Sequence, residues 1–331
     1  MDHTVLGRTG LKVSVAGLGC GGFSRLGLST GKTEAEAVAL VQNALDQGVN
    51  FLDTARSYET EHIVGQALEG RARDSVVVAS KSYVHRGDEL LPASDLANNL
   101  DLSLKALRTD YIDVFQIHAP PMWVFDHFMD IALPELVKAR DAGKIRHIGI
   151  SGIAADLRHE VLLRTADCDE FDVMLVAFHM MHQTARKALL PKTLEKRIGV
   201  HIMYAVRNIF ARQDALRTTF ADLAAKGLVP QELAARENPL DFLLHEGGAG
   251  SLTEAAYRFV RHEPGVDVVL FGTGEAAHVA ANIESILKPV LPAEDLNRLH
   301  EFFGHLEGVG MERPPWRVGS DGKPAQIPGA S

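Results

Sequence analysis

The chain is poor in cysteine, has no basic excess and lacks long apolar runs, and each shortage excludes a class of protein. Two of its 331 residues are cysteine, Cys20 and Cys168, far apart and in no CxxC pattern, which argues against a disulfide scaffold or zinc framework and favours a reducing, cytoplasmic setting. Lys and Arg number 34 against 43 Asp and Glu, a net charge of −9, so the clustered basic surface of a nucleic-acid-binding protein is not expected. No apolar stretch approaches the roughly 20 residues that span a bilayer. The opening MDHTVLGRTG has no basic or apolar signal-peptide region, so neither a leader nor a membrane partner is expected.

Eight short runs of apolar, largely β-branched residues recur along the chain. Most are continuous rather than strictly alternating, which is typical of parallel strands covered on both faces. The runs are residues 13–19, 50–53, 76–82, 111–118, 145–151, 172–178, 200–205 and 267–273. Segments of helical period are predicted at 33–48, 94–108, 134–144, 251–265 and 275–287. Thr33 with Glu36 forms a capping box for the first of them, and Ser94 is the expected cap of the second.

Strand–helix units repeated eight times predict an α/β fold, a (β/α)8 TIM barrel that occupies residues 1–331 as one domain. Ahead of it, VLGRTGLKV predicts an N-terminal β-hairpin that turns at Thr9 and Gly10. Residues 207–250 form a long insertion after the seventh strand, and residues 308–331, rich in Gly and Pro, form a C-terminal tail. Long loops of this kind in a barrel usually carry function.

Four polar side chains lie at or just past the ends of three consecutive predicted strands. Asp53 ends the second strand, Tyr58 follows it by five residues, Lys81 ends the third and His118 ends the fourth. Each alone has an ordinary explanation, such as a turn-forming aspartate, a surface tyrosine, a snorkelling lysine or a core histidine. Because the carboxyl ends of barrel strands share one rim, where the chemistry of such barrels takes place, the four together predict a proton-transfer site.

The chemistry of these groups suits a carbonyl substrate. A free tyrosine has a pKa of about 10, and a nearby ammonium such as that of Lys81 is expected to lower it. Burying Lys81 is costly unless a carboxylate pairs with it, and Asp53 could be that partner. His118 could orient the carbonyl oxygen and share in proton transfer. No side chain can supply a hydride, so a cofactor must carry it.

The segments FLDTARSY, VVVASKS and DVFQIHAP resemble those of the aldo-keto reductase family. The opening LGRTGLKVSVAGLGCGGF and the later VLFGTGEAAHVAANI are similar to that family too, so the resemblance covers about residues 5–287 with its motifs in order. It implies a (β/α)8 barrel that binds NAD(P)H in an extended pose, with Asp53, Tyr58, Lys81 and His118 as catalytic tetrad and Tyr58 as general acid. The implied reaction interconverts a small aldehyde, ketone or aldose and its alcohol or lactone. The alternative is a cofactor-sensing regulatory subunit of the same fold with little turnover.

The resemblance also implies a set of cofactor contacts. Ser151 matches the residue that holds the nicotinamide amide, but Gly152 stands where the family usually has asparagine. Phe178 stands where an aromatic ring should stack on the nicotinamide, although Leu175 replaces the usual glutamine. Further expected contacts are the backbone at Gly21 and Gly22, the helix N-terminus at Gly272, Thr273 and Gly274, the adenosine-side residues His278 and Asn282, and the phosphate contacts Arg207 and Arg212, either of which could instead be a surface charge.

Cofactor choice and substrate pocket follow from the same comparison. Members that prefer NADP commonly carry Lys or Arg where Gly274 lies, so the prediction leans toward NAD or dual use. Phe23 and Trp123 follow the first and fourth strands and could wall the substrate pocket, or could simply cover the barrel top. Trp316 in the tail could fold over the same mouth.

Three other patterns in the sequence do not favour a different fold or site. GLGCGG at residues 17–22 fits GxGxxG, but the next helix starts only near Thr33, so a Rossmann fold is not favoured. HMMH contains His179 and His182 without the strand-one His pair of metal-dependent barrel hydrolases, so no metal is predicted. Cys20 has no clear base partner and is interpreted as packing.

Overall fold

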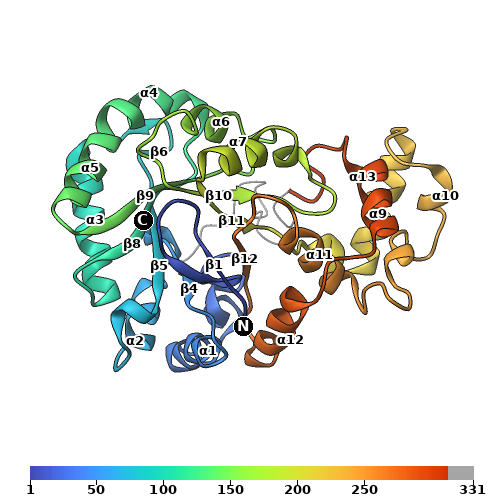
Figure 1. Ribbon diagram of the computed structural model, residues 1–331, viewed down its shortest axis with the longest axis horizontal. Coiled ribbons are helices and arrows are strands. Elements are labelled where there is room, and N and C mark those ends of the chain that lie inside the picture. The colour runs from blue at the N-terminus through green and yellow to red at the C-terminus, as the bar shows by residue number, and fades with distance from the viewer. Residues whose placement is uncertain (312–331) are drawn as a thin grey trace.

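Eight parallel strands close into a barrel in the computed structural model, which describes residues 1–311 (Figure 1). Neighbouring strands follow chain order, and the last pairs with the first to complete the ring. The strands are β3 (Ala16–Gly19), β4 (Phe51–Asp53), β5 (Val77–Ser82), β8 (Ile112–Ile117), β9 (Ile145–Ser151), β10 (Val173–Ala177), β11 (Gly199–Met203) and β12 (Val268–Phe271). The predicted (β/α)8 barrel is therefore confirmed. Most of the predicted tail, with Trp316, lies outside the described residues.

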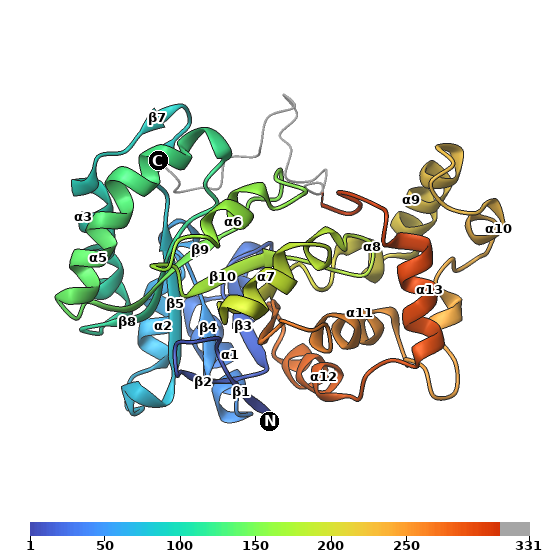
Figure 2. The same cartoon turned by 45° about the horizontal axis from the view of Figure 1, so that its top comes forward.

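The α-helices of the described residues surround the barrel or lie beside it (Figures 1 and 2). They are α1 (Glu34–Asp46), α2 (Glu61–Ala67), α3 (Ala93–Leu107), α4 (Phe125–His127), α5 (Leu133–Asp141), α6 (Glu160–Thr165), α7 (Leu189–Lys196), α8 (Asn208–Ala211), α9 (Gln213–Ala225), α10 (Gln231–Ala234), α11 (Leu252–Arg261), α12 (Ala276–Leu287) and α13 (Ala293–Phe303). The capping box of α1 is confirmed, because Thr33 accepts from the Glu36 N–H and Glu36 accepts from the Thr33 N–H. The expectation for Ser94 is wrong, since α3 already begins at Ala93 after Pro92, whose φ of −68° suits a helix start.

Two small hairpins are added to the barrel. The predicted N-terminal hairpin is confirmed as β1 (His3–Val5) paired antiparallel with β2 (Lys12–Ser14). The first predicted strand therefore divides at Val15, with its first two residues in β2 and residues Ala16–Gly19 in β3. The second hairpin, β6 (His85–Arg86) with β7 (Glu89–Leu90), follows β5 and had no signal in the sequence reading.

Side chains inside the barrel recur every second residue, as strand geometry requires. A small apolar cluster fills the amino end of the barrel, and the hairpin contributes Leu6 and Val13 to it. Gly7 N–H donates to Asp267 Oδ2 at 3.2 Å and Arg8 Nε donates to Asp172 Oδ1 at 2.9 Å, which fixes the hairpin there. Because this end is plugged, a site that uses the barrel interior must open at the carboxyl ends of the strands.

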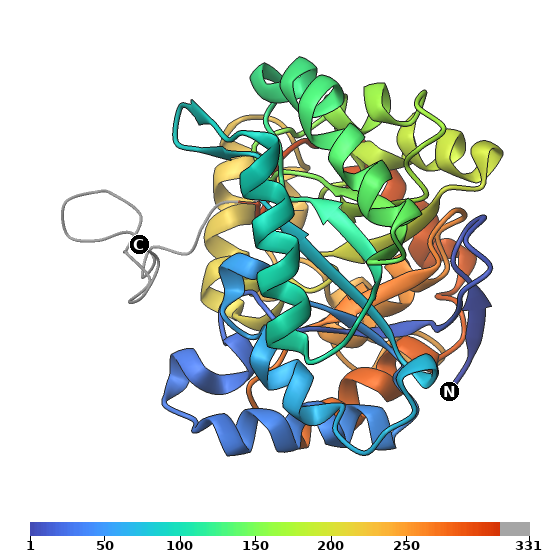
Figure 3. The same ribbon diagram turned by 90° about the vertical axis from the view of Figure 1, so that its left-hand side faces the viewer.

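The insertion forms a lobe beside the barrel. Figures 1 and 2 place α9, α10 and α13 on the side opposite α3 and α5, and Figure 3 shows α3 and α5 running side by side on their flank. Phe220 of α9 meets Phe303 of α13 edge-on, with ring centroids 5.7 Å apart. One apolar cluster continues from the outer faces of the barrel strands into this lobe, so the insertion shares the main core.

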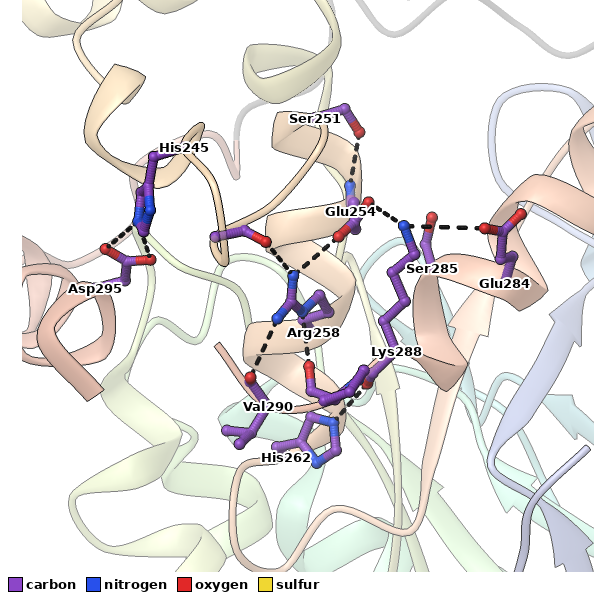
Figure 4. A network of polar contacts seen from close by, with 12 residues as sticks. His245, Ser251, Glu254, Arg258, His262, Glu284, Ser285, Lys288, Val290 and Asp295 are labelled. Atoms are coloured by element: carbon purple, nitrogen blue, oxygen red, sulfur yellow. Dashed lines mark hydrogen bonds and ion pairs between the residues drawn. The ribbon is translucent and has the colours of Figure 1, made fainter. Parts of the chain in front are cut away.

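A buried arginine fastens the lobe to α11 (Figure 4). Arg258 is 5% exposed and donates to the backbone carbonyls of Gly248, Pro289 and Val290 at 2.7, 2.7 and 3.1 Å. Its charge is balanced by Glu254 one helical turn earlier, at 2.9 Å. These bonds join the end of the insertion and the loop after α12 to one helix.

Candidate active site

Asp53 and Lys81 form a buried ion pair where β4 and β5 end. Asp53 lies two residues after Phe51 and Lys81 two after Ala79, so both point inward by the alternation of the strands. Lys81 Nζ donates to the two Asp53 carboxylate oxygens at 2.6 and 2.8 Å and to the Thr54 carbonyl at 2.9 Å, which uses all three ammonium protons. Burial raises the pKa of Asp53, but the Lys81 charge and the hydrogen bonds around the carboxylate outweigh this and leave that pKa lowered.

Tyr58 lies beside this pair on a 3-10 turn, Arg56–Tyr58. Arg25 holds the turn by donating to the Tyr58 carbonyl at 2.8 Å. Lys81 Nζ is 5.1 Å from the centroid of the Tyr58 ring, and His118 meets that ring edge-on at 5.6 Å. The structure therefore brings the four predicted side chains together at one rim.

The imidazole of His118 is held in place from several sides. It stacks on the ring of Tyr83 with centroids 4.2 Å apart and 8° between the planes. Ser57 Oγ lies 3.4 Å from its Nδ1. Burial and the Lys81 charge lower the pKa of His118 to about 3. His118 is therefore neutral at physiological pH and can donate a hydrogen bond from one nitrogen.

The pKa of Tyr58 departs from the sequence expectation. Burial raises this pKa well above its usual 10, and the Asp53 carboxylate raises it further. Lys81 does not reverse the shift because its charge is matched by Asp53 at 2.6 Å. Tyr58 is thus a fully protonated phenol at neutral pH, and the predicted lowering by Lys81 is not seen in this state.

Two residues expected to hold a nicotinamide, Ser151 and Phe178, make contacts with other parts of the protein. Ser151 Oγ accepts from the N–H of Ala119 at 2.8 Å, so it fixes the backbone that follows His118. Phe178 is fully buried and stacks on Phe259 of α11 at 5.5 Å. Phe178 belongs to the larger apolar cluster, and its stacking on a nicotinamide stays a prediction.

Tyr204 is another aromatic residue close to Tyr58. It follows β11 with a φ of 71°, is partly exposed, and lies close enough to Tyr58 to raise its pKa. The guanidinium of Arg207 lies over its ring at 4.4 Å, and Arg207 Nε donates to the Gly310 carbonyl at 2.6 Å. Arg207 therefore lies beside Tyr204, near Tyr58, whereas Arg212 pairs with Asp214 on the surface at 2.7 Å, as its alternative interpretation proposed.

Glycines leave bare backbone where β3 and β12 pair and end. A Cβ on Gly21 would lie 2.4 Å from the Tyr58 ring, so this glycine makes room for the phenol. Gly22 and Gly272 are exposed. Gly274 packs against Gly27, where a Cβ would come within 2.8 Å of the Gly27 Cα.

The remaining predicted contacts surround the start of α12. Thr273 Oγ1 accepts from the Glu275 N–H at 3.0 Å and lies 3.5 Å from His278 Nδ1. His278 is exposed and Asn282 is partly exposed one turn further on. Gly152 N–H donates to the Leu175 carbonyl at 2.8 Å, which makes it part of the strand end.

Aromatic side chains gather at the mouth. Trp123 and Phe23 are 53% and 49% exposed, as expected for pocket walls or a surface cover. His85 of β6 lies edge-on to Trp123 at 5.4 Å and to Tyr83 at 6.1 Å, so the unpredicted hairpin joins the rim.

The described part of the chain, residues 1–311, contains no cluster of three or more His, Cys, Asp or Glu side chains able to hold a metal ion. His179 and His182 instead accept backbone N–H bonds from Met181 and Gly308 at 3.2 and 3.1 Å. Within the same residues, no helix is both long and apolar enough to cross a membrane.

Four residues of this site are not predicted from the sequence, namely Gln116, His201, Tyr83 and Tyr204. The first two point into the barrel beside Asp53, at 3.5 and 3.6 Å from its Oδ1. A polar residue two places before His118, and a histidine within the apolar seventh strand, were the available signals. Tyr83 carried a similar signal, two residues after Lys81.

Comparison with known proteins agrees with this geometry. The model of the aldo/keto reductase family matches residues 17–303. The chain belongs to this family. As an aldo/keto reductase it is an oxidoreductase, from a family that uses a nicotinamide cofactor.

Relatives are similar along most of the chain. Aldo-keto reductase YhdN of Bacillus subtilis (strain 168) is 27% identical over 338 residues, which cover 96% of this chain and 99% of that protein. L-galactose dehydrogenase of Arabidopsis thaliana is 33% identical over 207 residues, covering 60% of this chain and 64% of the relative.

Solved structures share the fold. Aldo-keto reductase AKR11C1 from Bacillus halodurans, in its holo form, has a TM-score of 0.69 at 22% identity and covers 92% of this chain and 96% of its own. An aldo/keto reductase from Klebsiella pneumoniae, solved with NADP and acetate, has a TM-score of 0.64 at 22% identity with the same coverage.

Proposed function

We propose that this aldo/keto reductase interconverts a small aldehyde, ketone or aldose and its alcohol or lactone, using NAD(P)H as hydride carrier and Tyr58 as general acid and base. The observation that supports it most directly is the meeting of Tyr58, Lys81 and His118 at one rim of the barrel, with Lys81 Nζ 5.1 Å from the centroid of the phenol ring. A proton donor, a fixed cation and a neutral imidazole are the groups that carbonyl reduction needs.

The rim fits an extended dinucleotide. Gly22 and Gly272 leave exposed backbone on two adjacent strand ends, so a phosphate chain can approach it closely. Tyr204 supplies a partly exposed ring next to Tyr58 for the nicotinamide. When bound, the nicotinamide donates or accepts the hydride.

The side chains supply proton transfer and substrate orientation. Tyr58 is protonated at neutral pH, so in reduction it can give its proton to the carbonyl oxygen as charge develops there. Neutral His118 donates a hydrogen bond that orients the same oxygen, and Tyr83 keeps its ring plane fixed. Asp53 holds Lys81 below the phenol, and in oxidation the same groups act in reverse.

Substrate and cofactor preference are proposed more coarsely. The exposed rings of Trp123 and Phe23 could receive an apolar carbonyl or the face of a sugar ring, and L-galactose dehydrogenase among the relatives makes aldoses worth including. Packing against Gly27 leaves no room for a basic side chain at position 274, and Lys32 nearby is paired with Glu275 at 3.3 Å. We therefore keep NAD, or use of both cofactors, as the proposal.

The test is a turnover screen of aldehydes, ketones and aldoses with NADH and NADPH, for wild type and Tyr58→Phe. The variant should lose turnover by about 100-fold or more, because it deletes only the acid, while cofactor affinity changes little. Equal loss of affinity and turnover would contradict the assignment. Cofactor binding without turnover by the wild-type protein would favour the regulatory-subunit alternative, and a large preference for NADPH would contradict the cofactor proposal.

A further inference from the structure

The Asp53 carboxylate has polar neighbours besides its ion-pair partner Lys81. Its Oδ1 lies 2.6 Å from Lys81 Nζ, 3.5 Å from Gln116 Nε2 and 3.6 Å from His201 Nε2. These groups come from β5, β8 and β11, so polar atoms from three strands converge on one oxygen inside the barrel. A buried carboxylate is stable only when such donors compensate for lost water.

His201 is the least explained of these groups. Its side chain is fully buried, and neither ring nitrogen has a hydrogen-bond partner among residues 1–311. The residues paired with it on the adjacent strands, Leu175 and Val268, are apolar, and its ring lies 5.2 Å from that of Phe51. An unpaired buried imidazole costs free energy that an apolar side chain of similar size would avoid.

Among the described residues, Asp53 and Lys81 are the charged groups that shift the pKa of His201. Burial lowers the pKa of His201, so its ring is neutral near neutral pH and carries one N–H. The buried Cys20 thiol lies near the same pair, and burial raises its pKa, so it too is uncharged. Asp53 is therefore the acceptor toward which the N–H of His201 can turn.

We propose that His201 is a positioning residue that donates from Nε2 to Asp53, withdrawing part of the carboxylate charge so that more of the Lys81 field reaches the Tyr58 phenol. A movement of a few tenths of an ångström would bring the 3.6 Å separation to hydrogen-bond length. The inference rests on the proposed function, since it concerns how readily Tyr58 exchanges its proton. His201 acts through Asp53 and Lys81 and needs no contact with substrate.

This role differs from that of a core-filling residue in a measurable way. If His201 only fills space, leucine should replace it without changing the acidity of Tyr58. If it donates to Asp53, leucine leaves the carboxylate charge undiminished, and the Asp53 effect that already raises the pKa of Tyr58 becomes stronger. Glutamine, which carries an N–H₂ at a similar reach, should restore the bond.

The kinetic test compares His201→Leu and His201→Gln in the alcohol-oxidation direction, where Tyr58 must accept a proton. For His201→Leu we expect the rise of kcat with pH to move upward by about half a unit, with kcat about threefold lower at a fixed pH on that rise and KM little changed. His201→Gln should return most of the shift. A His201→Leu profile that superimposes on the wild-type profile would overturn the proposal.

A second measurement does not depend on turnover. Nitrogen-15 NMR of histidine-labelled wild-type protein should show His201 as a single neutral tautomer with its proton on Nε2. The resonance is assigned by its absence from His201→Gln, and His159→Asn controls for loss of another buried imidazole. Exchange between two tautomers, or an Nε2 signal unchanged in Asp53→Asn, would refute the bond to Asp53. The proposed oxidoreductase activity would remain untouched by that result, just as absence of turnover would leave the tautomer informative.

Discussion

Adjacent glycines after β3 differ in what a methyl group would meet. At Gly21 a Cβ would lie 2.4 Å from the ring of Tyr58, whereas at Gly22 it would meet no atom within 4 Å. Gly21→Ala should therefore push the phenol from its place and lower kcat by about tenfold or more, since a displacement near 1 Å is enough for such a loss. Steady-state kinetics measures this effect.

Gly22→Ala is the matched control, because it adds the same methyl group one residue further on. Its φ of 71° disfavours alanine, so the variant should lose about 1 kcal/mol of stability. The added methyl group should raise the KM for the cofactor but leave kcat at saturating cofactor close to wild type. If Gly22→Ala were as inactive as Gly21→Ala, contact with Tyr58 would not be the reason for glycine at position 21.

At this scale the sequence predicted which residues end strands better than which way they point. Asp53, Lys81 and His118 were found because barrel strand ends share a rim. Val173 of β10 belongs to the cluster inside the barrel, whereas Met174, Val176 and Phe178 belong to the larger outer cluster, where Phe178 packs on Phe259. The boundaries of β10, and therefore which of its residues face into the barrel, could not be predicted from the continuous apolar run DVMLVAF.

Among the secondary-structure elements, α11 is the one that holds the insertion lobe to the barrel. Replacing Arg258 by methionine keeps the length of the side chain but leaves three backbone carbonyls without their donor and removes one partner of Glu254 (Figure 4). We expect a loss of about 3 kcal/mol in the free energy of unfolding, measured by urea denaturation.

The control for this prediction is Arg236→Met, which breaks an ion pair to Asp241 at 2.6 Å whose side chains are about half exposed. Exposed pairs contribute about 0–1 kcal/mol, so this variant should unfold close to wild type. Equal losses from the two variants would mean that burial and the carbonyl contacts of Arg258 do not matter.

Secondary-structure elements could be predicted where local sequence patterns, such as apolar periodicity and helix capping, agreed with the burial of the side chains. Repeated strand–helix periods and the capping box at Thr33 identified the barrel and α1, and the turn at Gly10 identified the first hairpin. The β6–β7 hairpin was missed because its strands are two residues long and three of their four side chains are polar, with no apolar alternation to indicate a strand. The sequence does not predict the helices of residues 207–250, because short helices such as α8 and α10 depend on packing against neighbours.

For the molecule as a whole, buried neutral histidines should make stability sensitive to acid. Burial lowers the pKa of His118 to about 3 and those of His159 and His182 to about 4, against 6.5 in the unfolded chain. Below pH 6.5 the unfolded state therefore binds more protons, and each histidine lowers the free energy of unfolding by about 1 kcal/mol per pH unit down toward pH 4. Asp267, whose pKa burial raises to about 6, opposes this because its folded form binds the proton first. Urea denaturation between pH 7.5 and 4.5 should show falling stability, less steeply in His159→Asn and more steeply in Asp267→Asn, and a flat or rising wild-type profile would contradict the argument.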